Sequence, residues 1–435
     1  MDGFYYQPEI EKMPRKELEA LQLERLKWSV KQALKSPFYS KLYGKLGITA
    51  DTIQTLADLR KLPFTVKQDM RDNYPFGFLA VDKKELIRLH ASSGTTGNPT
   101  VICHTKHDID TWANRVARCF YMVGLRDTDV IQNSSGYGMF TGGLGMQAGI
   151  EWLGALAIPA AAGNSKRQIK CIMDYGTTAI HAIPSYALRL ADVFEEEGID
   201  PRKDTHLHTF LIGAEPHTEE TRRKIEERFG VKAYNCFGMT EMSGPGVAFE
   251  CKEQNGMHIW EDSYIVEIVD TETLEPVPDG EVGELVLTTL DREGMPLLRY
   301  RTRDLTRVLG RSCPCGRNHI RLDRMRGRSD DMMVLRGVNI FPIQIEKILM
   351  QFPQLGNNYL ITLTTDDNND NMTVEVELAE GTDDFKQLQM LEKEIRRQLK
   401  DEILLTPIVK LVSRGSLPVS EGKAVRVVDK RKVYQ

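Results

Sequence analysis

The chain has 435 residues, 41% hydrophobic and 27% charged, which predicts a globular protein of more than one domain with a sizeable core. Its 57 basic and 62 acidic residues give a net charge of −5 without a long basic run, which argues against nucleic acid as a partner. Because no secretory signal or membrane-spanning apolar run is visible and the seven cysteines are scattered, we expect a cytoplasmic protein without a membrane partner.

The first predicted element is an amphipathic helix over residues 15–36, ended by Pro37. Its apolar stripe consists of Leu23, Leu26, Val30, Ala33 and Leu34. This stripe needs a partner, which is either the main body of the protein or a second subunit.

Short apolar runs alternate with helical stretches from about residue 80 to 245, which predicts an α/β layered core. The expected buried strands are residues 130–133, 155–158, 179–183 and 209–212. A helix over 218–229 is indicated by Thr218 at its start and Gly230 after its end.

A polar run, SSGTTGNPT, occupies residues 92–100 between two expected strands. Gly94 and Gly97 can adopt positive φ and bring backbone N–H groups close to an anion, and the hydroxyl side chains add donors. The run therefore indicates a phosphate-binding loop, although it lacks the lysine of a Walker loop. The alternative is a hairpin turn rich in small polar residues.

The pattern changes to an antiparallel hairpin near residue 263, with strands 264–269 and 283–288 on either side of a Pro-Asp-Gly turn. After residues 326–331, a compact α+β unit is expected. Its predicted elements are a helix from Pro342, strands 358–364 and 372–378, a helix over 384–403, and a strand at 408–412.

Four further motifs could carry chemistry, and each has a plainer structural interpretation. Residues 213–216 are expected to form a turn after a buried strand, which is either a ligand-binding turn of the kind found in α/β folds or an ordinary strand-to-helix turn. Residues 234–241 offer an aromatic ring for a purine and a Thr-Glu pair for Mg²⁺, but could simply be a strand entering a loop. Asp304, read as a loop residue, could bind ribose hydroxyls or belong to a surface salt-bridge cluster. Lys423 follows a glycine, so it could present its ammonium group from a mobile turn. The plainer interpretation is a lone surface lysine.

In this order, the motifs resemble those of the adenylate-forming superfamily, which includes acyl-CoA synthetases, peptide-synthetase adenylation domains and luciferase. The resemblance runs from about residue 85 to the end and is closest to the phenylacetate–CoA ligase branch. The segments that carry it are SSGTTGNPT (92–100), SSGYGMFTGG (134–143), HAIPSYALRL (181–190), GAEPHTEETR (213–222), YNCFGMTEMSGPG (234–246) and RGRSDDMMVLRGVNIFPIQIE (326–346).

The resemblance implies an α/β fold class, with a large multi-layer N-terminal domain and a small mobile α+β C-terminal domain. The N-terminal domain would span residues 1–329, divided into a helical segment (1–80), an α/β core (81–250) and a β-rich part (251–329). The C-terminal domain would span 330–435 and rotate about a hinge at Asp330.

The resemblance also implies residue roles. Catalysis would depend on Lys423, on Thr240 beside the α-phosphate and on Glu241 as the Mg²⁺ ligand. The ATP site would comprise Ser93, Gly94, Thr95, Thr96, Gly97, Ala214, Glu215, Pro216, Asn235, Cys236, Phe237, Gly238, Met239, Asp304 and Arg328. The aryl pocket would include Tyr137, Phe140, Ala214 and Pro245, and Gly337 would belong to a loop on the CoA side.

The implied activity is that of an ATP-dependent aryl acid–CoA ligase, with phenylacetate as the expected acid and a homodimer as the expected assembly. A carboxylate with a pKa of about 4 is already ionised at pH 7, so the first step needs charge stabilisation rather than a general base. Benzoate, hydroxyphenylacetate and indoleacetate remain alternative substrates, and a carrier-protein thiol remains an alternative acceptor. A non-catalytic, zinc-stapled binding protein is the third alternative.

A second expected metal site is a structural zinc site. Cys313 and Cys315 form a Cys-Pro-Cys-Gly knuckle, and Cys251 with His258 would complete a closed tetrahedral set of three sulfurs and one imidazole. The alternative is a buried cysteine, a surface histidine and a chance Cys-x-Cys.

Overall fold

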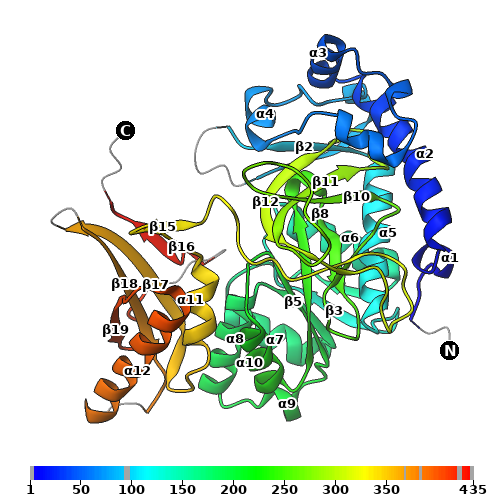
Figure 1. The fold of residues 1–435 in the computed structure, drawn as a ribbon. Coiled ribbons are helices and arrows are strands. Elements are labelled where there is room, and N and C mark those ends of the chain that lie inside the picture. Colours follow the sequence, from blue (N-terminus) through cyan, green and yellow to red (C-terminus); the bar gives the residue numbers. More distant parts are fainter. Residues whose placement is uncertain (1–3, 93–97, 367–368, 382–384, 419–423, 432–435) are drawn as a thin grey trace.

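The computed structural model describes residues 4–92, 98–366, 369–381, 385–418 and 424–431 (Figure 1). It is a mixed α/β fold with several sheets and a separate C-terminal unit, which confirms the predicted fold class. Over the described residues, no helix is long and apolar enough to cross a membrane.

The N-terminal segment is helical and packs on the body of the protein. It contains α1 (Pro8–Glu11), α2 (Arg15–Ala33), α3 (Pro37–Leu46) and α4 (Lys67–Asp72), with short 3₁₀ turns η1 (Ala50–Thr52), η2 (Leu56–Lys61) and η3 (Lys83–Glu85). Leu26, Val30 and Ala33 are buried in the same core as residues of the β-rich region, so the stripe of α2 is covered within this chain. Pro37 begins α3 rather than ending α2, as expected for proline in a first helical turn.

A nine-stranded sheet forms the centre of the large domain. Its order is β13 (Val308–Gly310), β14 (Arg321–Leu322), β9 (Met257–Ile259), β8 (Gly244–Glu250), β7 (Lys232–Met239), β6 (Thr209–Gly213), β5 (Ala179–Ala182), β3 (Val130–Asn133) and β4 (Leu156–Ile158). The run from β4 to β7 is parallel, and all four strands predicted from the apolar runs belong to it. Strands β9, β13 and β14 extend this sheet, so the residues predicted as the β-rich part of the N-terminal domain (251–329) are divided between two sheets.

Helices cover both faces of the parallel strands. They are α5 (Lys106–Met122) and α6 (Thr141–Leu153) on one face, and α7 (Ser165–Tyr175), α8 (Pro184–Glu196) and α10 (Glu219–Phe229) on the other, with the short α9 (Pro201–Asp204) nearby (Figure 1). Leu211 packs with the first pair, whereas its neighbours Phe210 and Ile212 pack with the second group, as strand alternation requires. Thr218 caps α10 as predicted, by accepting from the Thr221 N–H at 3.2 Å.

Two smaller sheets lie beside the main one. The polar run is flanked by the antiparallel pair β1 (Leu86–Ala91) and β2 (Val101–Thr105). The predicted hairpin is β10 (Tyr264–Val269) with β11 (Gly283–Thr289), joined by a third strand, β12 (Tyr300–Thr306). The interpretation of Asp304 as a loop residue is therefore wrong, because it lies within β12 and its backbone forms an antiparallel bridge to Arg328.

The C-terminal unit has its own core, formed by buried residues between Met333 and Val409. Its elements are β15 (Met333–Leu335), β16 (Val338–Ile340), α11 (Pro342–Leu349), β17 (Leu355–Asp366), β18 (Asn369–Leu378), α12 (Phe385–Ile403), β19 (Ile408–Val412) and β20 (Val427–Asp429). The four-stranded sheet has the order β19-β18-β17-β20. An independent core is the property that allows a unit to move as a rigid body.

Candidate active site and metal site

A cleft of about 2380 Å³ separates the C-terminal unit from the large domain. On the large domain it is lined by residues that follow the carboxyl ends of β3, β5, β6 and β7, where open α/β sheets bind ligands. On the C-terminal unit it is lined by residues of α11, β17 and β20. The predicted ATP-site residues that line this cleft are Ala214, Glu215, Pro216, Asn235, Cys236, Phe237, Gly238, Met239, Thr240, Glu241, Asp304 and Arg328.

The turn after β6 has a strained backbone. A side chain on Gly213 would put its Cβ 2.1 Å from the Cys236 carbonyl oxygen, so only glycine fits. Ala214 has φ of +68°, a left-handed conformation that a non-glycine residue adopts at a cost. Glu215 follows, and its carboxylate accepts from Ser185 Oγ at 2.9 Å. The strain and the fixed carboxylate make this turn a pre-formed part of the site.

The end of β7 is equally close-packed. A Cβ on Gly238 would lie 2.0 Å from the Gly244 carbonyl oxygen, which holds β7 tightly against β8. The Asn235 N–H donates to Glu250 Oε2 at 2.8 Å, and burial raises the pKa of Glu250 to about 7. Burial also raises the pKa of the Cys236 thiol well above its usual range, so this cysteine is unsuited to act as a nucleophile.

Glu241, the expected Mg²⁺ ligand, is buried in the 3₁₀ turn η4 (Thr240–Met242). Its Oε1 accepts from Thr100 Oγ1 at 3.1 Å, which connects it to the C-terminal end of the polar run. Lys67 Nζ of α4 lies 3.8 Å from the same oxygen, and this lysine also lines the cleft. The sequence reasoning missed Lys67, because α4 carries no motif and lies far from Glu241 in the chain.

Asp304 and Arg328 are adjacent, and Arg328 also contacts the expected hinge. Arg328 donates from Nε and Nη2 to the two carboxylate oxygens of Asp330, both at 2.8 Å. Its Nη1 lies 3.6 Å from Asp304 Oδ1. Burial raises the pKa of Asp304 to about 7 despite this positive charge. The segment around Asp330 is thus connected to the large domain through the Arg328 guanidinium group and through the Ser329 N–H, which donates to the Arg303 carbonyl at 2.8 Å.

The aryl-pocket residues are only partly brought together. Phe140, Ala214 and Pro245 line the cleft, but Tyr137 is not among its lining residues. The Tyr137 hydroxyl accepts from Asn133 Nδ2 at 3.0 Å and donates to Gln147 Oε1 at 2.9 Å, which holds it against α6. Its role as an aromatic gate stays a prediction.

Three predicted elements concern loops. The phosphate-loop residues Ser93, Gly94, Thr95, Thr96 and Gly97, and the catalytic candidate Lys423, lie outside the described residues. Gly337 lies at the tip of the β15–β16 hairpin, where it has φ of +80° and Arg336 has φ of +51°. Two consecutive positive φ values are typical of a type I′ hairpin turn, which explains the glycine.

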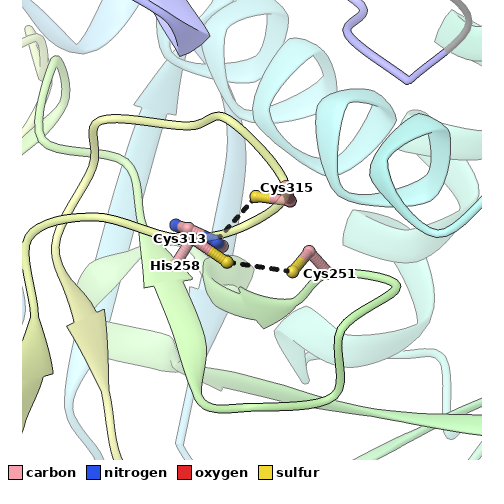
Figure 2. Close-up of side chains that lie close together, drawn as sticks. All are labelled: Cys251, His258, Cys313 and Cys315. Carbon is pink, nitrogen blue, oxygen red and sulfur yellow. Dashed lines mark hydrogen bonds between the residues drawn. The ribbon is translucent and has the colours of Figure 1, made fainter.

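The four expected zinc ligands do converge (Figure 2). All their ligand atoms lie within 4.8 Å of one another. Cys251 Sγ lies 3.8 Å from Cys313 Sγ, and Cys315 Sγ lies 3.3 Å from His258 Nε2. A tetrahedral zinc ion separates two sulfur ligands by about 3.8 Å and a sulfur from a nitrogen by about 3.6 Å, so the spacing fits.

The surroundings of the cluster also suit a metal. His258 Nδ1 lies 3.2 Å from the His319 carbonyl oxygen, which can only accept, so Nδ1 carries the proton and Nε2 offers its lone pair. Hydrogen bonding by Cys251 and then Cys313 lowers the pKa of the Cys315 thiol. The loop that carries Cys313, Cys315 and Arg317 also binds the N-terminal segment. Tyr5 donates to the Cys315 carbonyl at 2.6 Å, and Arg317 forms a buried ion pair with Glu11 at 2.6 Å.

Residues 47–289 match the AMP-binding enzyme family, and residues 337–431 match the AMP-binding enzyme C-terminal domain. The chain belongs to the AMP-binding enzyme family. Among its curated relatives are the phenylacetate-coenzyme A ligases of Thermus thermophilus (43% identical over 98% of this chain and 100% of the relative) and Pseudomonas putida (47% identical over 94% and 93%). These relatives confirm the resemblance and the predicted class, an AMP-forming acid–thiol ligase.

Solved structures extend the comparison to conformation. A 2-hydroxyisobutyryl-CoA ligase in the postadenylation state, in complex with 2-HIB-AMP, has a TM-score of 0.93 at 30% identity and covers 98% of this chain and 93% of that chain. The same ligase with CoA in the thioesterification state has a TM-score of 0.74 at 31% identity, covering 99% and 93%. The C-terminal unit is therefore arranged more as in the postadenylation state.

Proposed function

We propose that this chain is an aryl acid–CoA ligase, with phenylacetate as the first acid to test. The carboxylate would attack the α-phosphate of ATP to give acyl-AMP and pyrophosphate, and the CoA thiol would then displace AMP. The observation that carries the proposal is the convergence of Glu215, Glu241 and Asp304 on one cleft, in a chain whose full-length relatives are phenylacetate–CoA ligases. The aryl-pocket residues Phe140 and Pro245 on the same cleft support an apolar acid.

The proposal includes rotation of the C-terminal domain about Asp330 between the two steps, with the boundary after residue 329. Support comes from the separate core of the C-terminal unit, from the exposed position of Asp330, and from the different TM-scores with the two states of the related ligase. Lys423 would reach the α-phosphate during adenylation. Its neighbour Ala424 donates from its backbone N–H to Glu215 Oε1 at 2.8 Å, which supports this arrangement.

Two metal ions belong to the proposal. Glu241 would bind Mg²⁺ together with the ATP phosphates, which would supply positive charge at the reacting phosphate. Cys251, His258, Cys313 and Cys315 would hold a structural Zn²⁺, supported by their tetrahedral spacing and by the His258–His319 hydrogen bond. The homodimer and the cytoplasmic location stay predictions.

The test is acid-dependent ATP–pyrophosphate exchange over a panel of aryl acids, followed by addition of CoA. An aryl acid that supports exchange and then thioester formation is the expected result. Exchange without CoA thioester would indicate a carrier-protein acceptor. No exchange with any acid, in protein that binds zinc, would instead favour the non-catalytic binding protein.

A further inference from the structure

A buried histidine, His181, lies at the carboxyl end of β5 and lines the cleft. It pairs in register with Asn133 of β3 on one side and Leu211 of β6 on the other. It therefore occupies the middle of the sheet edge where the ligand crevice forms. The proposed adenylation and thioester steps leave this imidazole without a role.

The hydrogen bonds around His181 determine which ring nitrogen carries the proton. Asn133 Nδ2 donates to the Gly143 carbonyl at 2.7 Å, and because a carbonyl can only accept, the amide orientation is set. Asn133 Oδ1 therefore faces His181 Nδ1 at 3.1 Å and also accepts from Ser135 Oγ at 2.6 Å. An acceptor opposite Nδ1 requires Nδ1 to be the protonated nitrogen. His181 Nε2 then carries a lone pair.

No described residue hydrogen-bonds His181 Nε2. Burial lowers the pKa of His181 to about 4, so the ring is neutral and Nε2 remains an acceptor at pH 7. His181 is 5% exposed and lines the cleft, and its Nε2 is not among the buried polar atoms that lack a partner, so this nitrogen opens onto the cleft. There it can accept from water or from a ligand that supplies a donor, and a ligand that displaces the water without supplying a donor loses that hydrogen bond. The position thus favours a ligand that brings a hydrogen-bond donor.

The surroundings place this acceptor beside the proposed aryl pocket. Ser135 Oγ lies 3.0 Å from His181 Nδ1, and a Cβ on Gly142 of α6 would lie 3.9 Å from Ser135 Cβ. One turn further along α6, a Cβ on Gly145 would contact Pro245 at 2.9 Å. The start of α6 therefore connects His181 to Pro245, and Phe140 and Met146 of the same region line the cleft.

We propose that His181 Nε2 is a specificity-determining acceptor in the acid pocket, which selects aryl acids that carry a hydrogen-bond donor on the ring. Ring hydroxyl and indole N–H groups have this chemistry, whereas the unsubstituted phenyl ring does not. The apolar lining would bury the ring, and the single acceptor would accept a hydrogen bond from the substituent. Sites of this kind discriminate strongly, because the analogue without the donor leaves the acceptor unpaired.

The inference rests on the proposed ligase function, and matched acids test it. The pairs are 4-hydroxyphenylacetate with 4-methoxyphenylacetate, and indole-3-acetate with 1-methylindole-3-acetate; 4-fluorophenylacetate controls for the bulk of the methyl group. With the full chain, we expect kcat/KM for at least one donor-bearing acid to exceed that of its matched analogue about 10- to 100-fold. Equal efficiency within every pair would overturn the inference while leaving the ligase function intact.

Variants test whether the preference for donor-bearing acids depends on His181. His181→Leu removes the acceptor, so the ratio of the two kcat/KM values within the best pair should come close to one. Ser135→Ala is the matched control, because the His181 Nδ1–Asn133 bond remains and the preference should be retained. A preference that survives in folded His181→Leu protein would overturn the role of His181. The wild-type comparison decides the substrate class even if that variant does not fold, and failure of every acid in pyrophosphate exchange would refute the ligase function itself.

Discussion

The backbone N–H of Ala424 donates to Glu215 Oε1 at 2.8 Å across the cleft between the two domains. Glu215 belongs to the strained turn after β6, and its carboxylate also accepts from Ser185. One carboxylate thus connects the expected adenine-binding turn, helix α8 and the segment that follows Lys423. This contact would couple the docking of the C-terminal domain to the geometry of the proposed nucleotide site.

Glu215→Ala should weaken this docking. A hydrogen bond to a charged group contributes about 1.5–3 kcal/mol, so pyrophosphate exchange should fall roughly 10- to 100-fold. Thioester formation from presynthesised acyl-adenylate should change less, because the proposed rotation would move the C-terminal domain away from this contact. Glu281→Ala, at an exposed position in the hairpin turn, is the control. Equal loss in both half-reactions would contradict a state-specific role.

Lys423→Ala should abolish adenylation. Removing one preorganised positive donor at a developing charge typically costs on the order of 3–4 kcal/mol, or about 10²- to 10³-fold in rate. The variant should still convert presynthesised acyl-adenylate to thioester. Normal acid-dependent pyrophosphate exchange in this variant would show that another group stabilises the α-phosphate.

Asp330→Pro should separate the two half-reactions. Proline fixes φ near −65° and restricts the residue before it, which would block the hinge rotation. We expect adenylation to remain and thioester formation to fall by at least tenfold, as measured by CoA-dependent release of AMP. The neighbouring Asp331→Ala is the control for loss of a carboxylate. If Asp330→Pro supported both half-reactions at the wild-type rate, the rotation would pivot elsewhere.

Zinc removal should release the N-terminal segment. Tyr5 and Arg317 join this segment to the loop that carries Cys313 and Cys315. Loss of the metal should therefore also detach the N-terminal segment from the body of the protein. Cys313→Ser should reduce bound zinc below one equivalent, lower the Tm by about 5 °C or more, and expose residues 4–13 to proteolysis. Cys171→Ser, at a cysteine outside the cluster, should change none of these. Wild-type protein purified without chelator should contain one zinc per chain by metal analysis.

ATP binding should depend on the ionisation of Asp304. Its pKa is raised to about 7, so the carboxyl is mainly protonated below pH 7 and gains its full acceptor capacity above it. The KM for ATP should therefore fall as the pH rises from 5.5 to 8. Asp304→Asn should raise this KM and flatten the pH dependence, while the titration of ATP itself is common to both proteins and cancels. A wild-type profile parallel to that of Asp304→Asn would contradict the assignment.

The same raised pKa has a consequence for stability. Asp304 binds its proton more tightly in the folded state than the ordinary carboxyl of the unfolded chain does. Its contribution to the free energy of unfolding is therefore stabilising at low pH and is lost as the pH rises from about 4 to about 7. Binding of ATP above pH 7 would offset this loss, because the ligand stabilises only the folded state.

The sequence by itself determined the features that depend on neighbouring residues. Alternation of apolar runs located the parallel strands, and Thr218 with Gly230 located α10, because strands and caps are local patterns. The order of the motifs determined the family. The Cys-Pro-Cys-Gly knuckle with Cys251 and His258 predicted a set that does converge.

Only the tertiary structure decided which distant residues meet. Lys67 Nζ lies 3.8 Å from Glu241 Oε1 although α4 and η4 are far apart in the chain, and no local pattern records that contact. The lone pair of His181 Nε2 follows from a chain of hydrogen bonds through Asn133 to Gly143, three residues on separate elements. Asp304 lies in a strand and not in a loop for the same reason. Side-chain direction and pairing depend on packing between segments far apart in the chain, and this information is absent from any short stretch of sequence.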